Sequence, residues 1–247
     1  MNIGKLTYAG KNSLTDFGVY VTGSGTHNAA ERDTTTFSIA GRNGDLVVDN
    51  GRYKNIQVIY PAFIPHTFVT EEQKVRNWLR TGAAYGKIAD TYDTTHFRLG
   101  RPVGELTFTP VRPNGANFQI TFDCDPRRFL VSGDSFTTIT GGSWSAANPT
   151  EFDARPQIAV GDPENGMEIE ITDGDGRVTT FTATDDHVGL VIIDCETQDI
   201  YDDSTLANLN SLFTISGEFP SLSAGTNLIT LTGNYSAASV RPRWWEL

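Results

Sequence analysis

The sequence predicts a mainly β protein with one short α-helix. Of its 247 residues, 24 are Gly, 11 Pro, 14 Phe and 8 Tyr but only 2 are Met, a composition typical of turn-rich β domains rather than helical bundles. Short runs of β-branched and aromatic residues recur between clusters of Gly, Asn and Asp. Because 38% of the residues are apolar and 20% are charged, the chain can bury a core and does not have the composition of a disordered protein.

The charge of the chain changes abruptly near its middle. Residues 1–131 contain 15 Lys and Arg against 12 Asp and Glu, a net charge of +3, whereas residues 132–247 contain 4 against 18, a net charge of −14. The change falls around residues 129–135. A break of this size indicates two domains, which we expect at residues 1–131 and 132–247.

The first domain contains strand-like segments bounded by glycine turns. Thr34–Ile39 and Tyr53–Tyr60 are rich in β-branched and aromatic residues and are predicted to be strands. Residues 43–45 and 49–51 contain Asn, Gly and Asp, which tolerate a positive φ, so both are turn candidates. Further along, two alternating segments flank a Pro-Asn-Gly turn at 113–115 and predict a hairpin formed by residues 104–109 and 117–123.

One segment of the first domain predicts a helix, from about Glu71 to Arg80. Thr70 and Gln73 have the spacing of a capping box, and carboxylates in the first turn suit the helix dipole. Gly82 is the expected stop. The apolar residues that fall on one face of this helix are Val75, Trp78 and Leu79.

The second domain predicts a β-sandwich. Its strand-like runs are separated by turn clusters such as GDPENG (161–166) and DGDGR (173–177), a spacing typical of sandwiches. The predicted strands are residues 156–160, 167–172, 178–183, 188–194 and 228–232.

The sequence predicts no catalytic, cofactor or metal site. Cys124 and Cys195 are 71 positions apart, which fits no metal or redox spacing, and free buried thiols are expected. An EF-hand register starting at Asp173 puts Val178 where Gly is needed, so DGDGR is predicted to be a hairpin turn. No GxSxG motif occurs. The histidines, none of them in an HxH or HExxH motif, are His27, His66, His96 and His187.

The overall charge limits the possible partners. A net charge of −11 and a pI near 4.7 argue against a protein that grips the phosphate backbone of nucleic acid. No apolar run reaches the roughly 18 residues that span a bilayer, so no membrane partner is expected. The opening MNIGKLTYAG lacks the features of a signal peptide, so we expect synthesis in a cytoplasm.

Several separated segments resemble one family. The segment FSIAGRNGDLVVDNGRYKNIQVIY from Phe37 contains a GR-x-GDL turn followed by DNG-x-Y-x-N and an apolar strand. Further matches are FDCDPRRFL from Phe122, IDCETQDIY (193–201), GEFPSLSAGTNLITLTG (217–233) and the ending RPRWWEL (241–247). Together, and in this order, they resemble the distal tail protein (Dit) of long-tailed, non-contractile bacteriophages.

The resemblance implies a structural role in the virion. The first domain would be a sandwich or split barrel, with the short helix against it, that assembles into a ring, usually hexameric, at the tip of the tail tube. The second domain would be a galectin-like β-sandwich outside the ring. Such hubs join the last tail-tube ring to the tail-associated fibre protein, in many phages hold receptor-binding proteins, and leave a channel for DNA. No enzymatic activity is implied.

Within this family reading, two sets of residues are candidates for contacts. For the ring interface they are Arg42, Asp45, Asp49, Arg52, Tyr53 and Trp78. The alternative is that GRNGDL and DNGRY are simply turns whose glycines the backbone requires. The terminal Arg243, Trp244 and Trp245 are predicted to anchor an aromatic segment, either onto their own domain or onto a partner.

Two other functions are left open by the residues. A carbohydrate-binding module for host cell walls would use an exposed aromatic ring such as that of Trp144, although no galectin sugar patch can be mapped onto the second domain. A glycoside hydrolase would need a pair of carboxylates, and no pair is marked by its surroundings. Both have less support than the structural hub.

Overall fold

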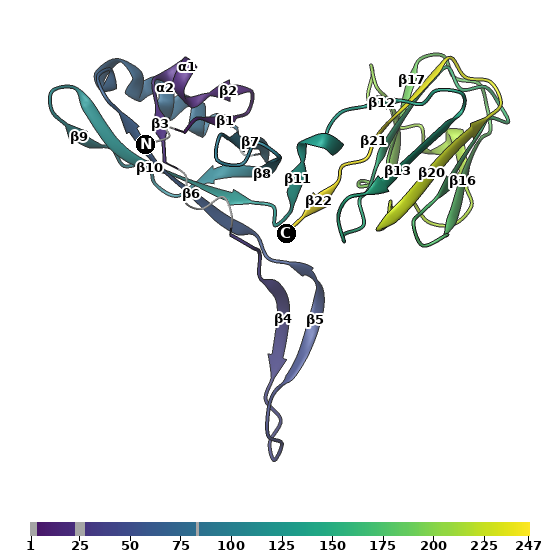
Figure 1. The fold of residues 1–247 in the computed structure, drawn as a ribbon, viewed down its shortest axis with the longest axis horizontal. Coiled ribbons are helices and arrows are strands. Elements are labelled where there is room, and N and C mark those ends of the chain that lie inside the picture. The colour runs from purple at the N-terminus through teal and green to yellow at the C-terminus, as the bar shows by residue number, and fades with distance from the viewer. Residues whose placement is uncertain (1–3, 23–27, 83) are drawn as a thin grey trace. The chain divides into compact units, whose positions relative to one another are not determined.

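The computed structural model describes residues 4–22, 28–82 and 84–247, and it is mainly β, as the sequence predicts (Figure 1). Its contacts divide the chain into two compact units. Unit 1 comprises Met1–Arg128 together with Leu247, and unit 2 comprises Phe129–Glu246. The division falls three residues before the boundary expected from the charge.

Unit 1 is built on one antiparallel sheet. Its two longest strands, β6 (Ile56–Ile64) and β10 (Gly115–Cys124), pair along their whole length, from Ile64 opposite Ala116 to Ile56 opposite Cys124. In β6 every second residue is buried, so that one face of the strand packs on the core. The strands in order across the sheet are β2 (Lys11–Asn12), β1 (Leu6–Tyr8), β7 (Gly86–Asp90), β8 (His96–Val103), β10, β6 and β3 (Tyr20–Val21).

The predicted helix is present as α2 (Phe68–Arg80), although it begins earlier than expected. Its N-cap is Thr67, and no side chain caps it, so the predicted capping box is wrong. Thr70 instead donates its hydroxyl to the Thr67 carbonyl, and Gln73 donates to Asn77. The apolar face is as predicted, because the buried residues of α2 are Val75, Trp78 and Leu79.

A second helix, α1 (Ser13–Phe17), was not predicted. The side chain of Asn12 caps it by accepting hydrogen bonds from the backbone N–H groups of Leu14 and Thr15, and Gly18 ends it with a φ of +64°. Five residues are too few to show a helical hydrophobic period. Phe17 joins the α2 residues in the core of unit 1.

Two predicted elements of the first domain are corrected. The strand expected at 53–60 is two strands, β5 (Leu46–Tyr53) and β6, and the turn expected at 49–51 lies inside β5. Gly51 does have a positive φ, +74°. It lies in β5 where the pairing with β4 shifts register, opposite the step from Arg32 to Thr34. The segment 104–108 is irregular, and the hairpin around Pro113 is made by β9 (Thr109–Val111) and β10.

Unit 2 is a sandwich of two five-stranded antiparallel sheets, as predicted. Its core lies between them and includes Ile158, Ile169, Phe181 and Ile193. The strands of the first sheet, in order, are β12 (Thr137–Thr138), β21 (Ala237–Arg241), β14 (Gln157–Gly161), β17 (Leu190–Asp194) and β18 (Asp199–Asp202). Those of the second are β13 (Ser143–Asn148), β20 (Gly225–Thr232), β15 (Glu168–Thr172), β16 (Val178–Ala183) and β19 (Phe213–Ile215).

The DGDGR segment is the hairpin turn that the sequence predicts. It joins β15 to β16, which pair from Thr172 opposite Val178. The Asp173 carboxylate accepts hydrogen bonds from the backbone N–H groups of Asp175 and Arg177 and so holds the turn closed. At the ends of unit 2, the short strands β11 (Arg128–Leu130) and β22 (Trp245–Glu246) pair with each other.

Candidate interaction surface

The most exposed hairpin of unit 1 is formed by β4 (Arg32–Phe37) and β5 (Leu46–Tyr53). In the described part of the chain these two strands pair only with each other. Figure 1 shows them extending away from the sheet and helices of unit 1, and nearly all their residues are exposed. A two-stranded hairpin is marginally stable by itself in water, so a hairpin of this kind needs further contacts.

The outer half of the hairpin carries large apolar side chains. Phe37 lies opposite Leu46 on one face of the hairpin, and Val47 lies opposite Thr36 on the other face. Phe37 is 51% exposed and Val47 60% exposed. Large apolar side chains grouped on one exposed element are a feature of interaction sites, so we take this surface as a candidate. We call it the apolar tip; its residues are Phe37, Ile39, Leu46, Val47 and Val48.

A charged ladder stiffens the inner half of the hairpin. The Arg32 guanidinium binds Asp49 at 2.7 Å and lies 4.7 Å from the centre of the Tyr53 ring. Arg52 binds Asp33 across the strands, also at 2.7 Å. Hydrogen bonds from Arg32 and Arg52 hold the pKa values of Asp49 and Asp33 below the usual value for Asp.

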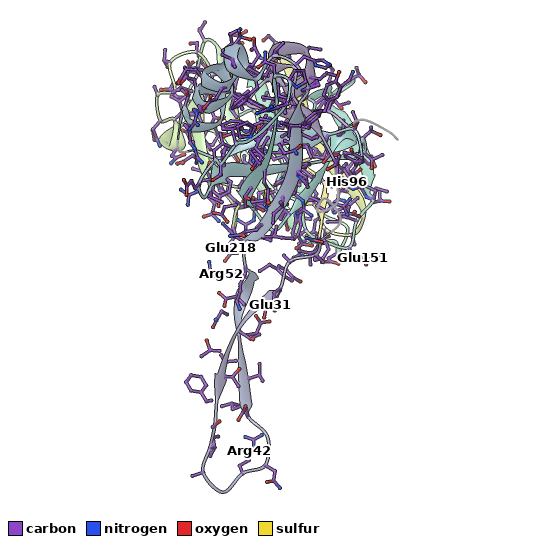
Figure 2. The ribbon with its side chains drawn as sticks, turned by 90° about the vertical axis from the view of Figure 1, so that its left-hand side faces the viewer. Glu31, Arg42, Arg52, His96, Glu151 and Glu218 are labelled. Carbon is purple, nitrogen blue, oxygen red and sulfur yellow. The ribbon has the colours of Figure 1, made fainter. Side chains whose placement is uncertain are left out.

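The turn of the hairpin is the GRNGDL motif. Gly41 and Gly44 both have φ near +80°, which favours glycine, and the Ser38 hydroxyl donates to Asp45 at 2.8 Å. Figure 2 shows Arg42 at the far end of the hairpin and Arg52 nearer its base. The glycines of GRNGDL are therefore required by the turn, as the alternative interpretation held. The charged residues of the motif, Arg42 and Asp45, are exposed on the hairpin as well.

Five of the six candidate ring residues lie on this hairpin, and Trp78 does not. The Trp78 ring is buried in the core of unit 1, where it stacks on Phe17 with ring centres 4.6 Å apart. Its indole N–H donates to the carbonyl of Tyr8 at 3.1 Å. Trp78 is therefore not part of the exposed surface.

The C-terminal residues are anchored on their own unit. Arg243 binds Asp194 through two hydrogen bonds, of 2.7 and 2.9 Å. Burial alone would raise the pKa of Asp194, but Arg243 and Gln157 hold it below its usual value. Trp244 is buried in the unit 2 core, and Trp245 stacks on Phe152. All these contacts lie within unit 2.

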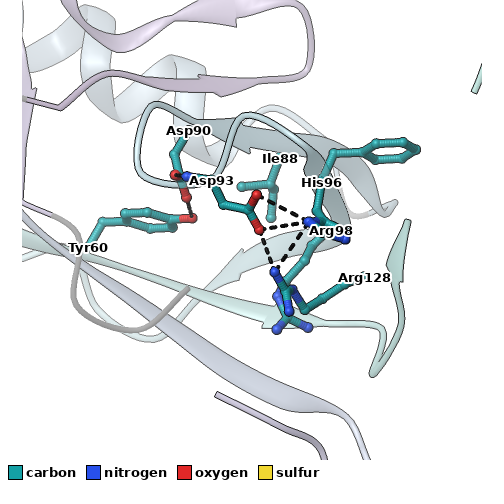
Figure 3. Close-up of a pocket in the computed structure, with 8 residues that line it drawn as sticks. Tyr60, Ile88, Asp90, Asp93, His96, Arg98 and Arg128 are labelled. Carbon is teal, nitrogen blue, oxygen red and sulfur yellow. Dashed lines mark hydrogen bonds and ion pairs between the residues drawn. The ribbon is translucent and has the colours of Figure 1, made fainter. Parts of the chain in front are cut away.

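A partly buried polar cluster in unit 1 was not anticipated from the sequence (Figure 3). Asp93 binds both His96 and Arg128, which overcome the effect of burial and hold the Asp93 pKa below its usual value. Nearby, the Tyr60 hydroxyl donates to Asp90 at 2.7 Å, and burial raises the Tyr60 pKa. The cavity lined by these residues is about 20 Å³, room for about one water.

Cys124 and Cys195 are free and buried, and burial raises the pKa of the Cys124 thiol to about 12. Within residues 4–22, 28–82 and 84–247, no three His, Cys, Asp or Glu residues are grouped so that they could hold a metal ion. His27 lies outside the described residues. Neither α1 nor α2 is long and apolar enough to cross a membrane, and the same holds for every described helix.

The signal for the apolar tip was present in the sequence. Leu46, Val47 and Val48 are consecutive, so they cannot all face one side of a strand. Such a run is typical of a strand buried on both faces, yet β5 has only one neighbour among the described strands. The missing neighbour could not be deduced from the chain alone.

Solved structures share this fold, among them the following two. The first is the SPP1 Dit protein (gp 19.1), described as a paradigm of the hub adsorption apparatus in phages that infect Gram-positive bacteria; it is 15% identical, covers 100% of both chains and has a TM-score of 0.69. The second is a chain of the phage p2 baseplate in its activated conformation with Sr, with 10% identity, 97% coverage of both chains and a TM-score of 0.60. No model of a protein family and no curated protein sequence matches the chain. The resemblance noted in the sequence is thus confirmed as a likeness of fold over the whole chain.

Proposed function

We propose that the chain is a structural hub of the distal tail or baseplate of a long-tailed bacteriophage, with copies assembled into a ring. The observation that carries the proposal is the apolar tip on the β4–β5 hairpin, in a chain whose fold is that of a protein described as a phage hub. In this role the protein binds other virion proteins and catalyses no reaction. Its place would be the tail tip of the virion.

The hairpin gives copies of the chain a physical reason to assemble. Its apolar side chains would be removed from water against unit 1 of a neighbouring copy, which stabilises an assembly by roughly 25 cal/mol per Å² of apolar surface buried. The ion pairs at the base, Arg32 with Asp49 and Arg52 with Asp33, hold the hairpin in one extended form. Less conformational freedom is then lost on association.

The charge of the two units suits different positions in such a ring. Residues 1–131 carry a net charge of +3, and residues 132–247 one of −14. A wall that neither attracts nor strongly repels phosphate allows DNA to slide, so we assign the channel to unit 1. Following the family resemblance, we propose six copies, and as partners the tail-tube protein, the tail-associated fibre protein and receptor-binding proteins.

Carbohydrate binding has less support. Trp144, the ring proposed for stacking on sugar, lies in β13 and packs against the unit 2 core. It is half-buried rather than presented on the surface. No observation favours a glycoside hydrolase.

Removal of the hairpin tests the proposal. Arg32 lies opposite Tyr53, and the Lys54 N–H donates to the Glu31 carbonyl at 2.9 Å, so residues 33–52 can be replaced by a two-residue Asn-Gly turn. We expect wild-type protein, alone or mixed with the tail-tube protein of its phage, to form six-fold annuli in negative-stain images. The deletion variant should remain monomeric while keeping the thermal unfolding of the wild type.

Point variants provide the matched comparison. Phe37→Ser with Val47→Ser should weaken assembly as the deletion does, whereas Val178→Ser, at an exposed valine of unit 2, should not. The proposal fails if wild-type protein stays monomeric both alone and with the tail-tube protein. The role of the hairpin in assembly is contradicted if the deletion variant forms the same annuli.

A further inference from the structure

One end of the unit 2 sandwich presents aliphatic side chains to water. At this end β14 and β18 finish, at Gly161 and Asp202, and β17 begins at Leu190. Val188 is 90% exposed and Leu206 is 72% exposed, and Leu190 is exposed as well. We call this surface the loop end; it consists of residues 161–166, 184–190 and 201–207.

Hydrogen bonds join the two loops that carry these side chains. His187, next to Val188, contacts the Asp202 carboxylate at 3.1 Å. The Leu206 N–H donates to the Asp202 carbonyl at 2.8 Å. The N–H of Asp203 donates to the carbonyl of Leu190 at 2.9 Å. The two loops that carry the three aliphatic residues are therefore joined at this end of unit 2, and each residue is exposed there.

The loops of this surface are fixed in place before any partner arrives. Asp162 and Gly189 are joined by two hydrogen bonds, from the Asp162 N–H to the Gly189 carbonyl and from the Gly189 N–H to the Asp162 carboxylate. One oxygen of Asp202 accepts hydrogen bonds from the backbone and hydroxyl groups of both Ser204 and Thr205. A surface ordered in this way loses little conformational entropy on binding.

The charge around the aliphatic residues has one sign. None of the segments 161–166, 184–190 and 201–207 contains a Lys or an Arg. Of the four arginines in unit 2, Arg177 binds Asp173, Arg241 binds Asp134, and Arg243 binds Asp194. The exposed carboxylates of the loop end are those of Asp162, Glu164, Asp185, Asp186 and Asp203.

We propose that the loop end binds a basic segment of another protein that carries aliphatic side chains. The aliphatic side chains of the segment would cover Val188 and Leu206, and its Lys or Arg residues would meet the surrounding carboxylates. The same charges repel nucleic acid and anionic membranes. They also repel unit 2 of a second copy, because its net charge is strongly negative. This inference does not depend on assembly through the hairpin.

A designed peptide tests the inference on the full chain. The probe is a fluorescent peptide, Lys-Leu-Lys-Lys-Leu-Lys with blocked ends, and its control has Gln in place of Leu. In anisotropy titrations we expect the Leu peptide to bind at least about tenfold more tightly than the Gln peptide, because only the former covers the aliphatic residues. We also expect its affinity to fall as salt is added.

Variants locate the site. Val188→Ser with Leu206→Ser should lower the affinity for the Leu peptide to that for the Gln peptide. Asp185→Asn with Asp203→Asn should lower the affinity for both peptides and reduce its dependence on salt. Val178→Ser, at the opposite end of β16, should change nothing. All these side chains are exposed, so the fold is retained, which circular dichroism verifies. Equal binding of the two peptides, or wild-type affinity in the Val188 and Leu206 variant, would overturn the proposal.

Discussion

Two hairpins of this molecule contain similar apolar residues but differ in whether those residues are buried. In β15–β16, Ile169 and Ile171 are fully buried in the unit 2 core while Glu168 and Glu170 face water. In β4–β5 the apolar side chains are as large, yet both faces are exposed. The first hairpin has a neighbouring strand on each side, β20 and β19, and the second has none among the described strands. Apolar residues thus stabilise one hairpin within the chain and leave the other to be stabilised by a partner.

The largest difference is expected from truncating one aliphatic residue in each hairpin. Ile169→Ala removes fully buried methyl groups and should lower the free energy of unfolding of unit 2 by about 2–5 kcal/mol. Val47→Ala, at an exposed position, should change the stability of the monomeric protein by at most about 0.5 kcal/mol. Urea unfolding followed by circular dichroism measures both, and equal losses would contradict the comparison.

A smaller difference in stability is expected between a buried ion pair of unit 2 and an exposed one of the β4–β5 hairpin. Arg243 and Asp194 are mostly buried, so Arg243→Ala leaves a buried carboxylate without its partner and should cost about 2 kcal/mol. Arg52 is 74% exposed, so Arg52→Ala should cost less than about 1 kcal/mol. Thermal unfolding of the two variants checks this, and the expectation fails if Arg52→Ala is the more destabilising.

A smaller effect still is expected in acid, where the stability contributed by the carboxylates of Asp93 and Asp194 is lost. The folded-state pKa values of Asp93 and Asp194 are lowered, so their ionised forms stabilise the protein above the unfolded-state value of about 4. This stability is lost as the pH falls from about 4 through the lower folded-state pKa values, because the unfolded chain takes up these protons before the folded protein does. Urea midpoints between pH 7 and pH 2.5 should fall less in Asp194→Asn than in the wild type. Identical pH profiles would contradict this assignment.

Much of the fold followed from local patterns. The five strands predicted in the second half exist, and they were found as strand-like runs between turn clusters; β15 also shows the alternating burial of a strand with one face in the core. The helix at 68–80 was found from its apolar face, whereas its predicted cap was wrong because Thr67, not Thr70, precedes the first turn. The short α1 was missed, since its stability comes from Asn12 and from Phe17 in the core.

The candidate surface was found only in part. Arg42, Asp45 and Asp49 were chosen from a motif, and the structure places them on one hairpin. Trp78 was chosen with them, but an amphipathic helix does not reveal whether its apolar face meets its own sheet or a partner. The loop end was missed altogether, because Val188 and Leu206 are 18 positions apart and belong to different loops.

The sequence by itself determined the β class, the turns at Gly44 and Asp173, and the unequal charge of the two halves, because these depend on residue type and near neighbours along the chain. Only the tertiary structure decided which apolar residues stay in water. Burial depends on segments that are distant in sequence: β15 is covered by the facing sheet of its sandwich, while the apolar tip of β4–β5 has no covering element in the described chain.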